Sequence, residues 1–320
     1  MTADDVRKLL DRINSNISKV ITGKREAVGL ILAGLVSGGH ILIEDVPGTG
    51  KTMMARCLAR SLDADFGRIQ FTPDLLPSDL TGVNYFNQKT FDFTFREGPV
   101  FTNILLADEI NRATPRTQSS LLECMEEKQV TIDGVTRKMK EPFFVIATQN
   151  PVESEGTFPL PEAQLDRFFM RIRPGYPTGE ESMTLLGKYE NGEPFTDVKS
   201  VASAAEIISA SHYILGIRVS SEIKKYIVDL VEQTRTQNNV ILGASPRAAI
   251  ALMRASQALA ASEGREFATP DDVKKASVPV LSHRLIVRKN ITEYENEAQE
   301  AAVRLSLETV SAPVEKVRDI

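Results

Sequence analysis

The sequence ILIEDVPGTGKTMMARCLARSL, residues 41–62, joins an apolar run typical of a strand to a pattern typical of a helix through a glycine-containing turn. At the carboxyl end of a strand, such a turn can direct several backbone N–H groups into one hollow, and the following helix presents its positive dipole end to an anion. Gly48 and Gly50 supply the permissive backbone. Lys51 can reach the outer phosphates, and the Thr52 hydroxyl can ligate the magnesium ion that accompanies them. The turn therefore predicts a phosphate-binding loop, with candidate nucleotide-binding residues Asp45, Val46, Pro47, Gly48, Thr49, Gly50, Lys51, Thr52 and Met53.

The loop departs at one position from the strict pattern G-x-x-x-x-G-K-[ST]. That pattern has glycine six residues before the lysine, and this chain has Asp45 there. Taken alone, the stretch leaves open a second interpretation, a glycine-rich turn between strand and helix that binds nothing. A second motif is therefore needed to decide between the two.

Residues 103–109, NILLADE, provide that motif, since they read as an apolar strand that ends in two adjacent carboxylates. In a parallel sheet, the end of this strand faces the same edge as the phosphate-binding loop. We predict that Asp108 holds magnesium through its water shell and that Glu109 polarises the water that attacks the terminal phosphate. Acids also follow strands as caps of the next helix, which is the simpler interpretation of this pair alone. Together, the two motifs predict a site that hydrolyses a nucleotide.

Length, charge and cysteine content narrow the class of protein. With 320 residues, the chain is long enough for two domains, each with its own core. Its net charge of −5 gives no general attraction to nucleic acid or to an anionic membrane. Cys57 and Cys124 are too few for a disulfide framework, and the acidic first residues are unlike a secretion signal, so a cytoplasmic location is expected. The longest apolar stretch, residues 28–36, is too short to cross a bilayer, and the three histidines have no ligand-like spacing for zinc.

Strand and helix patterns alternate in the first part of the chain, which predicts a parallel sheet covered by helices on both faces. After residue 177 only helical patterns remain, so we predict an α/β nucleotide-binding domain over residues 1–177 and a small helical domain over residues 178–320. The expected strands are 40–44, 67–71, 103–108, 143–148 and 168–172; the expected helices are 3–20, 24–37, 51–62, 115–127, 179–190, 198–212, 219–236, 245–262 and 270–281.

From Asp45 to Phe168, and again at residues 243–248, the chain resembles the MoxR family of AAA+ ATPases. The resemblance is carried by EDVPGTGKT, LLADEINRATPRTQSSLLECMEEKQVTIDG, ATQNPVESEGTFPLPEAQLDRF and GASPRA. The family also lacks the first glycine of the strict loop pattern. The resemblance implies an AAA+ P-loop core with sheet order 5-1-4-3-2, a helical lid and a homo-oligomeric ring, usually of six. Family members resemble chaperones that mature or load cofactors into partner proteins, often ones with von Willebrand factor A domains.

The resemblance also gives roles to four polar residues. Asn150 matches the position called sensor 1, which would hold the attacking water, although it could simply open the turn with Pro151. Arg167 matches the arginine finger, which would neutralise charge in the site of the adjacent protomer, and Arg171 is the competing candidate. Arg247 matches sensor 2, which would touch the bound phosphates from above and couple nucleotide state to lid angle. A surface ion pair for either finger candidate and a solvated first-turn arginine at position 247 are the simpler alternatives.

The base of the nucleotide is expected beside residues 20–23, through Ile21 and Gly23. This segment resembles the one that packs against adenine in the family, but it is equally consistent with a helix end and its glycine cap. The chain has no Asn-Lys-x-Asp stretch of the kind that reads guanine, so ATP with Mg²⁺ is predicted rather than GTP.

Two segments are predicted to project from the core. Residues 75–97 alternate phenylalanines as a short strand would, and by resemblance they form a helix-2 insert, which in related rings lines the central channel. Residues 129–141 contain an Asp133-Gly134 turn between alternating arms, which predicts a β-hairpin. The hairpin carries basic side chains, but charges on a hairpin are usually just solvated, so nucleic acid is not the expected partner.

The sequence therefore predicts a cytoplasmic AAA+ ATPase that hydrolyses ATP between protomers to remodel a protein client. Two other functions stay open at this point: a nucleic-acid-stimulated translocase and a nucleotide-gated scaffold with little turnover. Glu109 separates the scaffold from the ATPase, because a scaffold has no need of a poised base.

Overall fold

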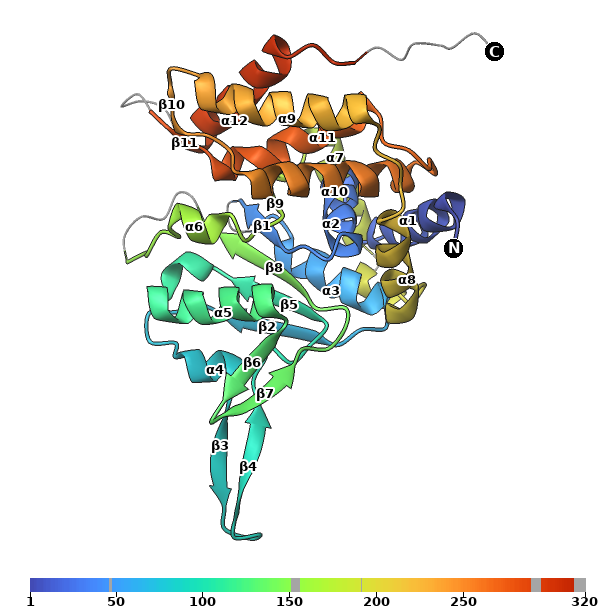
Figure 1. Cartoon of the computed structure of the whole chain (residues 1–320). Helices are drawn as coiled ribbons and strands as arrows, with labels where there is room; N and C mark the ends of the chain where they lie inside the picture. The colour runs from blue at the N-terminus through green and yellow to red at the C-terminus, as the bar shows by residue number, and fades with distance from the viewer. Residues whose placement is uncertain (46–47, 151–155, 191, 289–294, 314–320) are drawn as a thin grey trace.

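The sheet at the centre of the computed structural model is parallel and has five strands (Figure 1). The structure describes residues 1–45, 48–150, 156–190, 192–288 and 295–313. The sheet order, β2-β5-β8-β1-β9, is the predicted 5-1-4-3-2 order of the core strands, so this prediction is confirmed. The strands are β1 (Ile41–Glu44), β2 (Phe66–Gln70), β5 (Ile104–Asp108), β8 (Phe144–Gln149) and β9 (Met170–Ile172).

Successive side chains of the strands enter two different hydrophobic cores, one on each face of the sheet. Ile41 and Ile43 of β1 belong to the core that includes the first three helices, whereas Leu42 belongs to the core that includes α5. All residues of β1 and β5 are buried, which explains why these strands read as continuous rather than alternating apolar runs. The helices concerned are α1 (Ala3–Ile17), α2 (Arg25–Val36), α3 (Lys51–Ser61) and α5 (Pro115–Glu127).

The region after β9 is mainly helical and stacks above the sheet in Figure 1. Its core is continuous with that of the first three helices, since Ile31 of α2 and Leu252 of α10 belong to one buried cluster. The helices predicted after residue 177 are present. The one predicted over residues 198–212 begins at Ala204 instead, and α12 is an additional helix that the sequence did not predict. The helices after β8 are α6 (Glu162–Leu165), α7 (Gly179–Tyr189), α8 (Ala204–Ile214), α9 (Ser221–Thr236), α10 (Pro246–Ser262), α11 (Pro270–Leu281) and α12 (Glu295–Thr309).

Two short strands correct the expectation that only helices follow residue 177. Strand β10 (Val240–Leu242) pairs antiparallel with β11 (Ile286–Val287). The strands have three and two residues, which is too short for an alternating pattern to show in the sequence. Single 3-10 turns occur at η1 (Ile110–Arg112), η2 (Pro194–Asp197) and η3 (Ser282–Arg284).

Both predicted projections are present. Helix α4 (Pro77–Thr81) leads into a hairpin of β3 (Gly82–Asn87) and β4 (Asp92–Glu97), which extends away from the sheet on the side opposite the lid (Figure 1). Strands β6 (Gln129–Ile132) and β7 (Val135–Lys138) form the second hairpin. Its turn residues, Asp133 (φ 49°) and Gly134 (φ 79°), both have positive φ, as the predicted two-residue turn requires.

None of the described helices combines the length and hydrophobicity that a membrane span requires.

Candidate active site

The predicted phosphate-binding loop connects β1 to α3. Gly48 (φ 84°) and Gly50 (φ 87°) have left-handed backbones that a residue with a Cβ rarely adopts, and Gly50 is the N-cap of α3. A Cβ on Gly48 would meet no heavy atom within 4 Å, so this side of the loop is open. The N-terminal end of α3, where the helix dipole is positive, lies next to this opening, which is an arrangement suited to an anion. Val46 and Pro47 lie outside the described residues.

Lys51, the first residue of α3, lies over its own loop. Its Nζ donates a hydrogen bond to the backbone carbonyl of Asp45 at 2.8 Å. Burial lowers the pKa of Lys51, while the charges of Asp45, Asp108 and Glu109 oppose that effect. The lysine therefore lies in the field of both predicted acids, as the two sequence motifs require.

A buried threonine joins the two acids. The Thr148 hydroxyl, at the end of β8, donates to Asp108 Oδ1 at 2.6 Å and accepts from the backbone N–H of Glu109 at 2.9 Å. Glu109 has a left-handed backbone, φ 56° and ψ 51°, which is uncommon for a residue other than glycine. Thr148 is 1 % exposed, so both hydrogen bonds are shielded from water. Through these two hydrogen bonds, Thr148 fixes the direction of the backbone after β5 and thereby the positions of the Asp108 and Glu109 carboxylates.

Three polar side chains that the sequence did not single out hold these carboxylates. Gln70 Nε2 donates to Glu109 Oε2 at 2.7 Å, and Arg112 Nε lies 3.3 Å from the same oxygen. Arg68 Nη2 donates to Asp108 Oδ2 at 2.7 Å. Gln70 is paired with Asp108 in the register of β2 and β5, which places the end of β2 beside both acids. The position of Glu109 is thus determined by its neighbours as well as by its backbone.

Other predicted residues of this site lie at the same sheet edge. Asn150 directly follows β8, the strand between β1 and β5, as its predicted role requires. Thr52 is the second residue of α3, one place after the loop lysine. Met53 packs, partly buried, against the hydrophobic core rather than only lining the loop.

The segment expected to hold the base lies between the loop and the lid. Ile21 Cδ1 is 3.7 Å from the place where a Cβ on Gly50 would lie, so Ile21 borders the phosphate loop. Gly23 (φ 73°) lies against the carboxyl group of Glu181, in the first turn of α7, so closely that a Cβ would be 2.2 Å from it. This location agrees with the expected base pocket, whose occupancy by adenine stays a prediction.

His40, which immediately precedes β1, connects several segments at the edge of the sheet where the strands begin, opposite to the edge with the phosphate loop. Its backbone carbonyl accepts from the N–H of Phe169 at 2.7 Å, and its Nε2 donates to the carbonyl of Met125 at 3.0 Å. Its Nδ1 accepts from the N–H of Val145 at 3.0 Å. Burial lowers the pKa of His40 to about 4, so the ring is neutral. These contacts place the end of α5 and the residues before β9 at the start of β1, whereas the phosphate loop follows its end.

Two predicted arginines meet at this opposite edge. Glu126, in the last turn of α5, contacts Arg247 Nη2 with Oε1 at 2.6 Å and Arg167 Nε with Oε2 at 3.2 Å. The structure therefore brings Arg247 beside Arg167 and not to the phosphate loop of its own chain. Arg247 lies here because α10 begins beside the end of α5. The expected contact of Arg247 with bound phosphates therefore stays a prediction, and this position points to the phosphates of an adjacent protomer.

Arg171, the competing finger candidate, is inside the protein. Its side chain is 4 % exposed, with Nη1 3.4 Å from Glu44 Oε1 and Nη2 3.2 Å from Ser282 Oγ. A guanidinium held in this way has no path to a neighbouring protomer. Of the two candidates, only Arg167, which is 32 % exposed, lies at the surface.

The segment that carries Arg167 is tied to the lid by a second, buried arginine. Arg284 Nε donates to Asp166 Oδ1 at 2.7 Å, and its Nη2 donates to the carbonyls of Asp166 and Phe168 at 3.2 Å and 2.6 Å. Its side chain is 3 % exposed. The neighbouring His283 Nε2 also donates to the carbonyl of Phe168, at 3.0 Å. Residues on both sides of Arg167 are thereby fixed to the end of α11.

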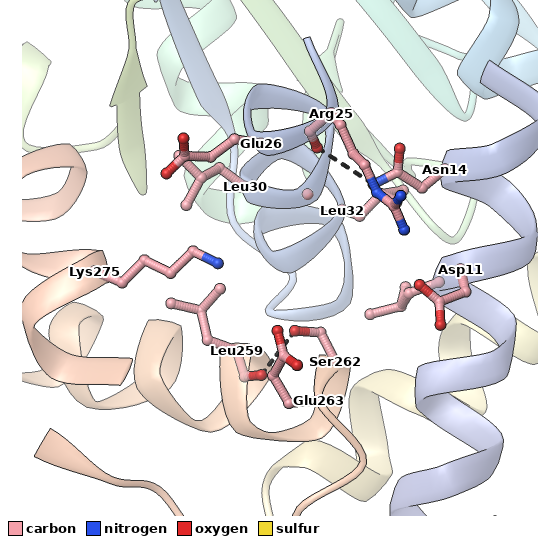
Figure 2. A pocket seen from close by; sticks show the side chains of 12 residues that line it. Asp11, Asn14, Arg25, Glu26, Leu30, Leu32, Leu259, Ser262, Glu263 and Lys275 are labelled. Atoms are coloured by element: carbon pink, nitrogen blue, oxygen red, sulfur yellow. Dashed lines mark hydrogen bonds between the residues drawn. The ribbon is translucent and has the colours of Figure 1, made fainter. Parts of the chain in front are cut away.

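A hollow of about 410 Å³ lies away from all of these residues, between α1 and α2 on one side and α10 and α11 on the other. Figure 2 shows Leu30 and Leu259 facing it, with Asp11, Glu26 and Lys275 around its rim. None of the predicted site residues lines it. The hollow therefore lies between the N-terminal helices and the lid, away from the predicted nucleotide site.

The fold and the loop, acid and lid geometry define an ATPase of the AAA class. Residues 40–170 match the family model described as the ATPase family associated with various cellular activities (AAA), and residues 232–304 match the AAA lid domain. A solved structure from Cytophaga hutchinsonii, named as a candidate ATPase, is 38 % identical and superposes with a TM-score of 0.87 over 98 % of this chain and 97 % of that one.

Two curated relatives narrow the class. Chaperone MoxR1 of Mycobacterium tuberculosis is 39 % identical over 95 % of this chain and 82 % of its own length. The Bacillus subtilis protein YeaC is 48 % identical over 98 % of both chains. The chain belongs to the MoxR family of AAA+ ATPases.

Proposed function

We propose that this chain hydrolyses ATP to ADP and phosphate at the sheet edge formed by the ends of β1, β5 and β8. The observation that carries the proposal is the pair of hydrogen bonds through which Thr148 fixes Asp108 and Glu109, with Lys51 in their field. Lys51 would neutralise the outer phosphates, and Glu109 would accept the proton of the attacking water. Asn150, at the end of the strand between them, would orient that water.

The donors at this edge fit a magnesium ion. Thr52 and Asp108 offer a hydroxyl and a carboxylate, the hard oxygen ligands that Mg²⁺ prefers. Both Asp108 oxygens already accept hydrogen bonds from Thr148 and Arg68, which supports contact to the ion through its water shell rather than directly. When bound, the ion would neutralise charge on the phosphate oxygens. ATP with Mg²⁺ is therefore the proposed cofactor pair.

The active unit is proposed to be a homo-oligomeric ring, six protomers by resemblance. Glu126 holds Arg167 and Arg247 at the end of α5, which lies near the start of β1, whereas the phosphate loop of the same chain follows the end of β1. A second protomer placed against the end of α5 would present its triphosphate to both guanidiniums. Charge that develops in the transition state would then be stabilised from two chains.

The partner is proposed to be a protein client, by family resemblance one with a von Willebrand factor A domain. At the tip of the β3–β4 hairpin, Phe86 packs edge to face against both Phe91 and Phe93, and the three rings belong to residues that are 50 %, 81 % and 68 % exposed. Exposed aromatic clusters of this kind are typical of protein-binding surfaces. The relative from M. tuberculosis is named a chaperone. We further propose a cytoplasmic location.

Nucleic acid is the less favoured partner. Arg137, on the second hairpin, stacks its guanidinium 3.9 Å from the ring centre of Phe95 in the same chain. An arginine used in this way is less available for a phosphate backbone. A titration in which DNA or RNA raises the ATPase rate severalfold would instead support a translocase.

The decisive experiment replaces Glu109 by Gln, which removes the base but keeps the shape of the side chain. We expect turnover to be lost while ATP still binds, because the loop and Lys51 are unchanged. Steady-state phosphate release and equilibrium binding of labelled ATP measure the two properties. Wild-type protein that binds ATP with almost no turnover would support the scaffold function, and no binding at all would overturn the proposal.

Sharing of the site between protomers is tested by mixing. Arg167→Ala and Glu109→Gln subunits are each expected to be inactive alone. In a mixed ring, some interfaces pair an intact Glu109 with an intact Arg167, so activity should return. Absence of recovery, or a protein that stays monomeric with ATP in mass measurements, would refute the shared site.

A further inference from the structure

Glu126 is placed where one carboxylate serves two cations. Each of its oxygens contacts a different arginine, Arg247 at 2.6 Å and Arg167 at 3.2 Å. The three residues come from α5, from the lid helix α10 and from the segment before β9, so their meeting depends on the tertiary fold. Two guanidiniums that lie beside the same carboxylate repel each other, and the negative charge of Glu126 reduces this electrostatic repulsion.

The contact with Arg167 is made through its Nε atom. Glu126 Oε2 lies 3.2 Å from this atom, which is the guanidinium nitrogen nearest the aliphatic stem of the side chain. A carboxylate that holds Nε fixes the plane of the guanidinium while leaving its terminal donors for an incoming oxygen. The backbone of Arg167 is already fixed by Arg284 through Asp166 and Phe168. Only the side chain remains to be oriented.

We infer that Glu126 is a positioning residue that holds Arg167 and Arg247 as one pair for the triphosphate of the adjacent protomer. The inference rests on the proposed function, because it assumes that hydrolysis is shared between chains. It adds a residue that touches neither the nucleotide nor the attacking water. Through Arg247 it also links the lid helix α10 to the presentation of Arg167. The pKa of Glu126 is lowered, chiefly by its hydrogen bond to Arg247, so the carboxylate is ionised at neutral pH.

A purely structural role makes a different prediction. Glu126 is 34 % exposed and Arg247 is 54 % exposed. Ion pairs with this exposure contribute little to folding and are screened by salt. If the contacts of Glu126 contribute only to folding stability, removing its charge should change the melting temperature slightly and leave kcat unchanged.

The test compares Glu126→Gln with Glu127→Gln. Glu127 is the next residue of α5, is exposed and forms no ion pair among the described contacts, so its substitution removes the same charge at almost the same place. We expect Glu126→Gln to lower kcat by at least about tenfold, as a displaced catalytic group does. Binding of ATP to the variant's own loop should be unchanged, because that loop lies at the other sheet edge. Glu127→Gln should behave as wild type.

Mixing experiments then assign the defect to one face of the protomer. Glu126→Gln subunits should recover activity when mixed with Glu109→Gln subunits, whose arginine pair is intact. They should not recover with Arg167→Ala subunits, because both defects lie on the same face. Equal kcat for the two glutamine variants, or recovery with Arg167→Ala, overturns the inference while leaving the proposed function intact. A wild-type protein without ATPase activity overturns both.

Discussion

The Thr148→Val substitution tests the geometry of the acidic pair most directly. Valine matches the size and branching of threonine but has no hydroxyl, so the change removes two hydrogen bonds with little change in packing. The hydroxyl now donates to Asp108 Oδ1 at 2.6 Å and accepts from the N–H of Glu109 at 2.9 Å, and the residue is 1 % exposed. A hydrogen bond to a charged group contributes about 1.5–3 kcal/mol, and a buried donor left without a partner costs about 1–3 kcal/mol.

Since the two effects overlap, we expect the free energy of unfolding to fall by about 2–4 kcal/mol. We also expect kcat to fall by about tenfold or more, because Glu109 would no longer be held where β5 ends. Urea unfolding and phosphate release, both measured well below the melting temperature, give the two quantities. Thr131→Val is the matched control, since Thr131 Oγ1 lies 2.9 Å from Thr136 Oγ1 on an exposed hairpin. Thr148→Val with the stability and kcat of this control would refute the reasoning.

Three further predictions concern stability. Gly29→Ala in α2 should stabilise the protein by about 0.5–1 kcal/mol, because its Cβ would meet open space beside the hollow of Figure 2 and alanine favours the helix. Gly34→Ala in the same helix should destabilise it, since that Cβ would lie 2.6 Å from a core side chain; thermal melts that rank the two variants the other way would contradict the packing. The pKa of His40 is lowered to about 4 in the folded protein against 6.5 when unfolded, so the unfolded state binds more protons below pH 6.5. Stability should be fully present above pH 6.5 and fall as the pH drops towards 4, by roughly 3 kcal/mol in total from this ring. His40→Gln should flatten this pH dependence in urea titrations and His212→Gln, at the surface, should not; equal slopes would argue against the assignment. Arg284→Met should cost about 3–5 kcal/mol in the same titrations, because it removes the donors to the carboxylate and the backbone carbonyl of Asp166, and a loss below 1 kcal/mol would show that the lid is held in other ways.

The main elements of the fold could be predicted because each depends on a short stretch of neighbouring residues in the sequence. The order of glycine, lysine and threonine around Gly50 predicts a phosphate-binding loop without further information. Asp108 and Glu109 are recognised because they come at the end of an apolar strand. The hairpin turn was predicted from Asp133 and Gly134, whose positive φ values are a property of those two residues. Such features need no knowledge of what lies next to them in space.

The partners of the acids could not be predicted because they depend on which strands become neighbours. Gln70 looks like an ordinary polar strand end until the sheet order places β2 beside β5. Glu126 is one of three glutamates in α5, with Glu123 and Glu127, and only the orientation of the helix selects it. The neighbours of Arg247 could not be predicted for the same reason. Its motif predicts contact with bound phosphates, but the residues beside it depend on where α10 begins.

The separation of the two sheet edges decides how the site must be completed. Strand β1 has four residues, so its first and last Cα atoms are roughly 10 Å apart at about 3.3 Å per residue. An ion pair needs nitrogen and oxygen within about 4 Å. The end of α5 is fastened to the start of β1 by the hydrogen bond between His40 and Met125, and the Arg167 segment is fastened to the lid by Arg284. These contacts hold both arginines near the start of β1, whereas the phosphate loop follows its end. If a second copy supplies these arginines, as we propose, the ATPase rate per chain should rise with protein concentration in step with assembly.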